Sequence, residues 1–116
     1  VGPKDMDFAQ LYDSFSINPI IYAEDLGLCA KGQGGAFFAG GRTAPGGEFP
    51  VNTYGGLMSF GHVGDASGQT MIVEAARQIM GIAGEARQLK KADLGVVHCY
   101  GGMMSEHATL VLGSAS

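Results

Sequence analysis

The 116-residue sequence has no tryptophan, only four prolines and only two cysteines. The cysteines, Cys29 and Cys99, are far apart and lack the Cys-x-x-Cys or mixed Cys/His spacing of a structural metal site. A disulfide-stapled scaffold and a zinc centre are therefore excluded as interpretations, and we expect no bound metal. Sparse cysteine without a framework favours a reducing, cytoplasmic setting.

Charge is also scarce. Charged residues make up 16% of the chain, and the 7 Lys and Arg against 11 Asp and Glu give a net charge of −4. No basic cluster is denser than Lys90-Lys91, so the electrostatic pattern of a nucleic-acid or anionic-membrane partner is absent. No apolar run reaches the roughly 18 residues that a membrane-spanning helix needs.

The sequence is rich in apolar residues and in glycine. Hydrophobic residues make up 46% of the chain, enough for one folded domain over residues 1–116. The 20 glycines follow no Gly-X-Y period and instead mark loops and turns. The pattern predicts strands at 6–12, 94–99 and 107–112, helices at 17–26 and from 65–67 to 83, an irregular loop at 31–50 and a strand-and-turn piece at 51–59. This order favours an α/β fold with a mixed sheet.

The longer helix shows the clearest periodicity. Ile72, Ala75, Ile79 and Ile82 form one apolar stripe along this helix. Glu74, Arg77 and Gln78 are expected on the opposite, solvated side.

Four residues are placed to carry chemistry. His62 lies in a glycine-rich loop before a helix, while Tyr12 and the pair His98-Cys99 end strands. Catalytic side chains often occupy such strand ends in α/β sheets, so we predict that Tyr12, His62 and Cys99 converge at one edge of the sheet. A turn-stabilising histidine and a small core thiol are the structural alternatives, and both stay open on local sequence alone.

Four segments taken together resemble a known family. They are YDSF at 12–15, DLGLCAKGQGGA at 25–36, the NTYGG-to-GH stretch at 52–62 and HCYGG at 98–102. In this order and spacing they are similar to the C-terminal half of a thiolase, in the branch of sterol-carrier-protein and nonspecific lipid-transfer-protein thiolases. The resemblance extends over essentially the whole chain.

The resemblance implies a thiolase-like fold, with this chain as a C-terminal half-domain fragment of a mixed, five-layer-type α/β architecture. It implies a full-length acyl-CoA acyltransferase of the 3-ketoacyl-CoA thiolase or acetyl-CoA acetyltransferase type, a transferase of lipid metabolism acting on lipid or sterol-related substrates. Coenzyme A is then a substrate, and no separate cofactor is expected. The nucleophilic cysteine of the family belongs to the N-terminal half, so that half is an expected partner, the fragment alone is expected to be inactive, and a homodimer is expected.

The resemblance also implies roles for individual residues. His62 matches the histidine that activates the nucleophilic thiol and binds a thioester oxygen, although Val63 and Asp65 depart from the family's loop. Cys99 matches the acid/base cysteine, while Ser14 stands where this branch carries another cysteine. The expected catalytic residues are Tyr12, His62, His98 and Cys99, and the expected substrate-binding residues are Asn52, Gly61, Ser67, Gly101 and Gly102.

Two other functions remain open. Tyr12 suggests a thiolase-like retro-aldolase, in which a phenol is the acid/base and no acyl-enzyme forms. A non-catalytic acyl-CoA or lipid-binding homologue is the third interpretation. A nucleophilic cysteine in the sequence preceding Val1 would favour the acyltransferase. Loss of the other half is expected to expose either the stripe at Ile72 or the faces beside Val96 and Val97, and to cause self-association.

Overall fold

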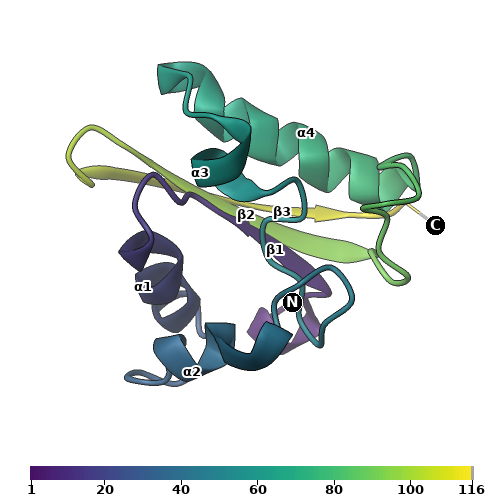
Figure 1. The fold of residues 1–116 in the computed structure, drawn as a ribbon, viewed down its shortest axis with the longest axis horizontal. Coiled ribbons are helices and arrows are strands. Elements are labelled where there is room, and N and C mark those ends of the chain that lie inside the picture. The colour runs from purple at the N-terminus through teal and green to yellow at the C-terminus, as the bar shows by residue number, and fades with distance from the viewer. Residues whose placement is uncertain (116) are drawn as a thin grey trace.

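The computed structural model describes residues 1–115 as an α/β domain in which helices cover both faces of a small sheet (Figure 1). The strands are β1 (Phe8–Leu11), β2 (Leu94–Gly101) and β3 (Glu106–Gly113). The α-helices are α1 (Ile17–Asp25), α2 (Gly34–Phe38), α3 (Gly56–Phe60) and α4 (Ser67–Met80), and short 3₁₀ turns occupy Pro3–Asp5, Ala39–Gly41 and Gly64–Ala66.

The sheet is mixed, as the sequence predicts. Its order is β1-β2-β3, with β1 parallel to β2 and β2 antiparallel to β3. Leu11 pairs with His98, so the residues that follow β1 lie beside the last residues of β2. This register brings two chemically important segments, far apart in the sequence, to one end of the sheet.

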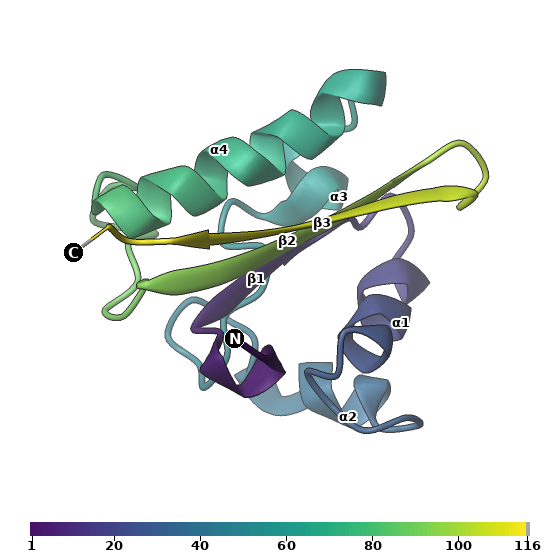
Figure 2. The ribbon, with the colours of Figure 1, turned by 180° about the vertical axis from the view of Figure 1, so that it is seen from behind.

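The helices divide between the two faces. α4 lies on one face, while α1 and α2 lie on the other (Figures 1 and 2). The run Val96-Val97 is buried between these layers, because a strand covered on both sides needs apolar residues in consecutive positions. Val96 and Val97 are themselves covered, whereas their partners beside them on β3, Val111 and Leu110, are exposed.

The orientation of α4 differs from the predicted one. Glu74 and Gln78 are buried beside Met71 and Ala75, whereas Val73, Met80 and Ile82 are exposed. The polar side chains tolerate burial because they bond to each other and to neighbours: Gln78 Nε2 donates to Glu74 Oε1 at 3.0 Å, and Thr53 Oγ1 donates to the same oxygen at 2.7 Å. The spacing of apolar residues does not reveal that Glu74 and Gln78 are buried, because hydrogen bonds offset the cost of burying these polar groups.

The predictions for two further segments were wrong in part. The segment 51–59 contributes only a single bridge, between Val51 and Ala9, and then forms α3. Asn52, Gly55 and Gly56 all have positive φ, which turns the chain away from the sheet.

The segment 31–50 is likewise not wholly irregular, because it contains α2. At Gly34 a Cβ atom would lie 2.7 Å from Ile20 Cγ2, so glycine lets α2 pack closely on α1. Glu24 Oε1 accepts a hydrogen bond from the Gly34 N–H at 2.8 Å, which satisfies a backbone donor in the first turn of α2.

Candidate active site

A cavity of about 550 Å³ lies at the end of the sheet where β1 and β2 finish. Tyr12 comes directly after β1, His62 comes shortly after α3, and Cys99 belongs to β2. The lining residues are Tyr12, Ser14, Phe15, His62, Gly64, Asp65, Gly68, Cys99, Tyr100, Gly101 and Gly102. The predicted convergence of Tyr12, His62 and Cys99 is therefore found in the structure.

Tyr12 and His62 are directly hydrogen-bonded. The phenol Oη lies 2.9 Å from His62 Nε2, and the two rings meet edge to face. Burial raises the pKa of the Tyr12 phenol, so Tyr12 keeps its proton at neutral pH. A protonated phenol against an imidazole nitrogen forms a pair through which a proton can pass to or from a bound substrate.

A partly buried hydrogen bond and two glycines fix the conformation of the loop that carries His62. The Val63 N–H donates to Ser67 Oγ at 2.9 Å, and Ser67 is fully buried. Gly61 and Gly64 have positive φ, which gives the loop its sharp course. Ser67 and Gly61, two of the predicted substrate-binding residues, do not line the cavity. In the structure both instead fix the conformation of the loop that carries His62.

Cys99 faces the first turn of α4. A Cβ atom at Gly68 would lie 3.5 Å from Cys99 Sγ, which shows how closely the thiol approaches that helix. Burial raises the pKa of the Cys99 thiol, so the resting group is the neutral thiol. A protonated thiol in the cavity can donate a proton to a carbanion and take it back in the reverse direction.

Tyr100 and Ser14 also line the cavity, although no role was predicted for Tyr100. Their hydroxyl groups form a short hydrogen bond, and Asn18 Nδ2 donates to Ser14 Oγ at 3.1 Å. The Tyr100 ring packs edge to face against Tyr12, with centroids 4.9 Å apart. The signal for Tyr100 was its position inside HCYGG, between Cys99 and the glycines that line the same cavity.

His98 lies outside this cavity, in contrast to the other predicted catalytic residues. Its Nδ1 is 2.7 Å from Thr109 Oγ1 and its Nε2 is 3.3 Å from His107 Nδ1, while His107 Nε2 is 3.1 Å from the Met104 carbonyl oxygen. A carbonyl only accepts, so His107 Nε2 is the donor to Met104. For neutral imidazoles, His98 Nε2 then donates to His107 Nδ1, and the Thr109 hydroxyl donates to His98 Nδ1.

Asn52 is likewise away from the cavity. Its side-chain Oδ1 accepts from the Leu11 N–H at 2.7 Å, and its Nδ2 donates to the Leu11 carbonyl at 2.9 Å. Asn52 thus supplies, from a side chain, the two hydrogen bonds that a neighbouring strand would give to β1. Gly101 and Gly102 do line the cavity, as predicted.

Within residues 1–115, no group of three or more His, Cys, Asp or Glu side chains is placed to hold a metal ion. In the same part of the chain, every helix is too short or too polar to cross a bilayer.

Comparison with known proteins identifies one matching family and several similar proteins. Residues 1–114 match the family described as thiolase C-terminal domain-like. An acetyl-CoA acetyltransferase of Methanothermobacter thermautotrophicus is 43% identical over 100 residues, which cover 86% of this chain and 26% of that protein. Sterol carrier protein 2 of Rattus norvegicus is 41% identical over 101 residues, which cover 87% of this chain and 18% of that protein.

A solved structure described as an Ltp2-ChsH2(DUF35) aldolase is also similar. It superposes with a TM-score of 0.85 at 31% identity, covering 98% of this chain and 28% of that one. The chain thus covers between 18% and 28% of the length of these relatives.

Proposed function

The chain belongs to the thiolase C-terminal domain-like family, and on that premise we propose that it supplies the acid/base half of an active site that makes or breaks a carbon–carbon bond beside a coenzyme A thioester. The observation that carries the proposal is the meeting of the Tyr12–His62 hydrogen bond and the Cys99 thiol in one cavity. The reaction favoured is acyl transfer of the thiolase type.

In the cleavage direction, a thiolate outside this chain attacks the 3-keto carbon of a 3-ketoacyl-CoA. The bond between the α- and β-carbons breaks and its electron pair goes to the α-carbon, while the acyl group stays on the attacking sulfur. The Cys99 thiol gives its proton to the α-carbon, and an N–H of His62 stabilises the thioester oxygen while it carries negative charge. A coenzyme A thiol then removes the acyl group and its proton returns to Cys99.

The hydrogen bond from Tyr12 favours a second candidate, retro-aldol cleavage. Here the Tyr12 phenol passes its own proton to His62 Nε2 as it accepts the proton of a β-hydroxyl group, the bond between the α- and β-carbons breaks, and a carbonyl product leaves. The thioester enolate that remains takes the proton held by His62, and no acyl-enzyme forms. The similarity to a structure described as an aldolase supports this candidate.

The two reactions are separated by substrates and by trapping. The protein that carries this chain at its full natural length is given acetoacetyl-CoA with coenzyme A, and separately a 3-hydroxyacyl-CoA with a tertiary β-carbon. Acyl transfer predicts thiolysis of the first substrate, an acyl-enzyme in the mass spectrum, and loss of turnover in Cys99→Ala. Retro-aldol cleavage predicts a ketone from the second substrate without a covalent adduct. Binding of both thioesters without turnover would contradict both proposals and favour a non-catalytic homologue.

A further inference from the structure

A second cavity, of about 420 Å³, lies at the opposite end of β1 from the candidate active site. Met6 precedes β1 and lines this cavity, whereas Tyr12 follows β1 and lines the other. The volume is within the roughly 300–1,000 Å³ of small-molecule sites. The cavity therefore has the size of a ligand site and a location separate from the reacting groups.

The GLCAKGQGG segment contributes directly to this cavity, although the proposed chemistry does not use it. Leu28, Cys29 and Gln33 of that segment are lining residues. The close packing of Gly34 on Ile20 fixes α2 against α1, and so fixes where Gln33 and the following turn of α2 lie. A specific stretch of sequence thus builds the wall of a cavity remote from the catalytic groups.

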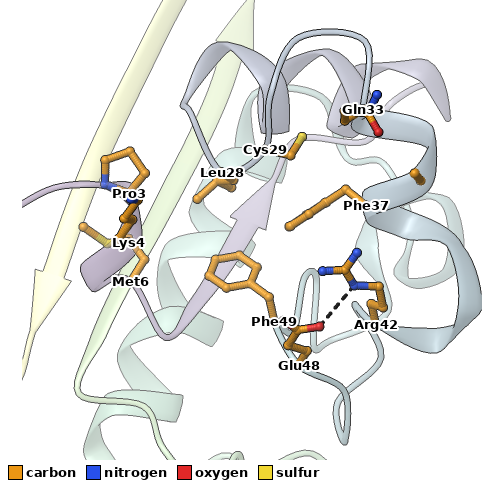
Figure 3. A pocket seen from close by; sticks show the side chains of 11 residues that line it. Pro3, Lys4, Met6, Leu28, Cys29, Gln33, Phe37, Arg42, Glu48 and Phe49 are labelled. Atoms are coloured by element: carbon orange, nitrogen blue, oxygen red, sulfur yellow. Dashed lines mark hydrogen bonds and ion pairs between the residues drawn. The ribbon is translucent and has the colours of Figure 1, made fainter.

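The remaining walls combine aromatic rings with one guanidinium group. Phe37 and Phe49 lie with ring centroids 5.7 Å apart, and Met6 adds a flexible apolar side chain. Figure 3 shows the guanidinium of Arg42 directed toward these rings, with its Nε bonded to Glu48. That bond, 3.2 Å long, uses only Nε, and within residues 1–115 the two terminal nitrogens of Arg42 have no hydrogen-bond partner.

The lining of this cavity has a net positive charge. Lys4 and Arg42 are cationic and Glu48 is the single carboxylate, so the cavity has an excess of one positive charge. Paired terminal nitrogens of an arginine match the two oxygens of a carboxylate. We propose that this cavity binds a small monocarboxylate with an aromatic or short aliphatic body, its carboxylate on Arg42 and its body against Phe37 and Phe49.

The test measures binding of 4-phenylbutyrate to the full-length protein by calorimetry, beside the neutral 4-phenylbutyramide. The carboxylate is expected to bind, and the amide to bind about tenfold or more weakly, because hydrogen bonds to charged groups are the stronger ones. Arg42→Gln should weaken carboxylate binding by a similar factor. The variant should still fold, because the ion pair of Arg42 with Glu48 is exposed and contributes little to stability. Lys90→Gln removes an equal charge outside this cavity and should leave the affinity unchanged.

Cys29 provides an independent readout inside the cavity. Saturating 4-phenylbutyrate should slow alkylation of Cys29 several-fold and leave Cys99 unaffected, as measured by peptide mass spectrometry. Equal affinity for acid and amide, no effect of Arg42→Gln, an equal loss in Lys90→Gln, protection of Cys99 instead of Cys29, or no binding at about ten millimolar would each overturn the proposal.

Discussion

Tyr12 and Tyr22 both pack their rings against Tyr100, yet within residues 1–115 only the Tyr12 hydroxyl has a hydrogen-bond partner. The ring centroids lie 4.9 Å and 6.3 Å from that of Tyr100. The Tyr12 Oη contacts His62 Nε2, whereas the Tyr22 Oη is buried and unpaired. The Tyr12 hydroxyl therefore lies in the candidate active site, whereas the Tyr22 hydroxyl is buried outside it. Tyr12→Phe and Tyr22→Phe remove the same group and form a matched pair of variants.

For retro-aldol cleavage, in which Tyr12 is the acid/base, Tyr12→Phe should lower kcat of the full-length protein by about 10²–10⁴-fold, the range for loss of a positioned acid/base. The substitution keeps the ring and removes only the hydroxyl that contacts His62. Turnover of the substrate identified by the assays above is the measurement. Tyr22→Phe is the control and should retain near-normal turnover, because Tyr22 does not line the cavity. Equal rates for Tyr12→Phe and the unmodified protein would remove Tyr12 from the chemistry.

Tyr22→Phe should leave stability unchanged or raise it by up to about 1 kcal/mol, because burying a hydroxyl without a partner costs free energy. Burial raises the pKa of Tyr22 to about 12, which reflects the same apolar surroundings. Hydrogen–deuterium exchange of peptides from α1 should show equal or greater protection in the variant. Clearly faster exchange there would show that the hydroxyl makes a stabilising contact.

Cys99 should react slowly with iodoacetamide at pH 7, and its labelling rate should rise with a midpoint above the ordinary thiol value of about 8.5. The reason is that burial disfavours the thiolate and so raises the pKa of Cys99. Labelling followed by peptide mass spectrometry over pH 6–10 measures it. Rapid labelling at pH 7 would mean that the thiolate is already present, and that Cys99 is better suited to act as a nucleophile.

The His98 region should become less stable as the pH falls. Burial, and then the nearby His107, lower the pKa of His98, so the folded chain resists a proton that the unfolded chain accepts. Below the unfolded value of about 6.5 the unfolded state binds more protons, and stability is lost from that pH downward toward the folded pKa. The groups facing His98 are Tyr22, His107 and Thr109, and Asp25 opposes the shift.

The measurement is hydrogen exchange of β2 and β3 peptides between pH 7.5 and 5, corrected for intrinsic exchange rates. Protection in these strands should decline on acidification, and His98→Gln should flatten the response. An unchanged decline in His98→Gln would assign the effect to another group.

Glu74→Ala should destabilise the domain by about 3 kcal/mol, the size expected when a buried, paired carboxylate is removed. Its loss removes the acceptor of Thr53 Oγ1 and one of the two acceptors of Gln78 Nε2, and leaves Arg87 without its ion pair. The thermal unfolding midpoint of the full-length protein is the measurement. Glu85→Ala removes an exposed carboxylate and should have little effect. A small change in Glu74→Ala would show that the apolar residues of α4 suffice to hold it.

Periodicity located the main elements because their signals are local. The apolar run at Val96-Val97 predicted a strand covered on both faces, and positions at strand ends or before a helix predicted that Tyr12, His62 and Cys99 lie together. Their roles in catalysis stay predictions. What sequence could not give were relationships set by tertiary contacts. Glu74 looked solvated because its partner Thr53 is distant in sequence, and His98 looked catalytic because its partners on β3 were unknown.

The alternation of β2 limits how this sequence can change. Cys99 contacts the first turn of α4, while the neighbouring His98 ring packs against Tyr22 of α1, so adjacent residues serve different layers. An insertion or deletion of one residue within β2 would exchange the two, placing an imidazole where the thiol stands. Related sequences that keep the activity are therefore expected to vary in length at the hairpin tip or in the segment before Leu94. Within β2 they should differ only by point substitutions.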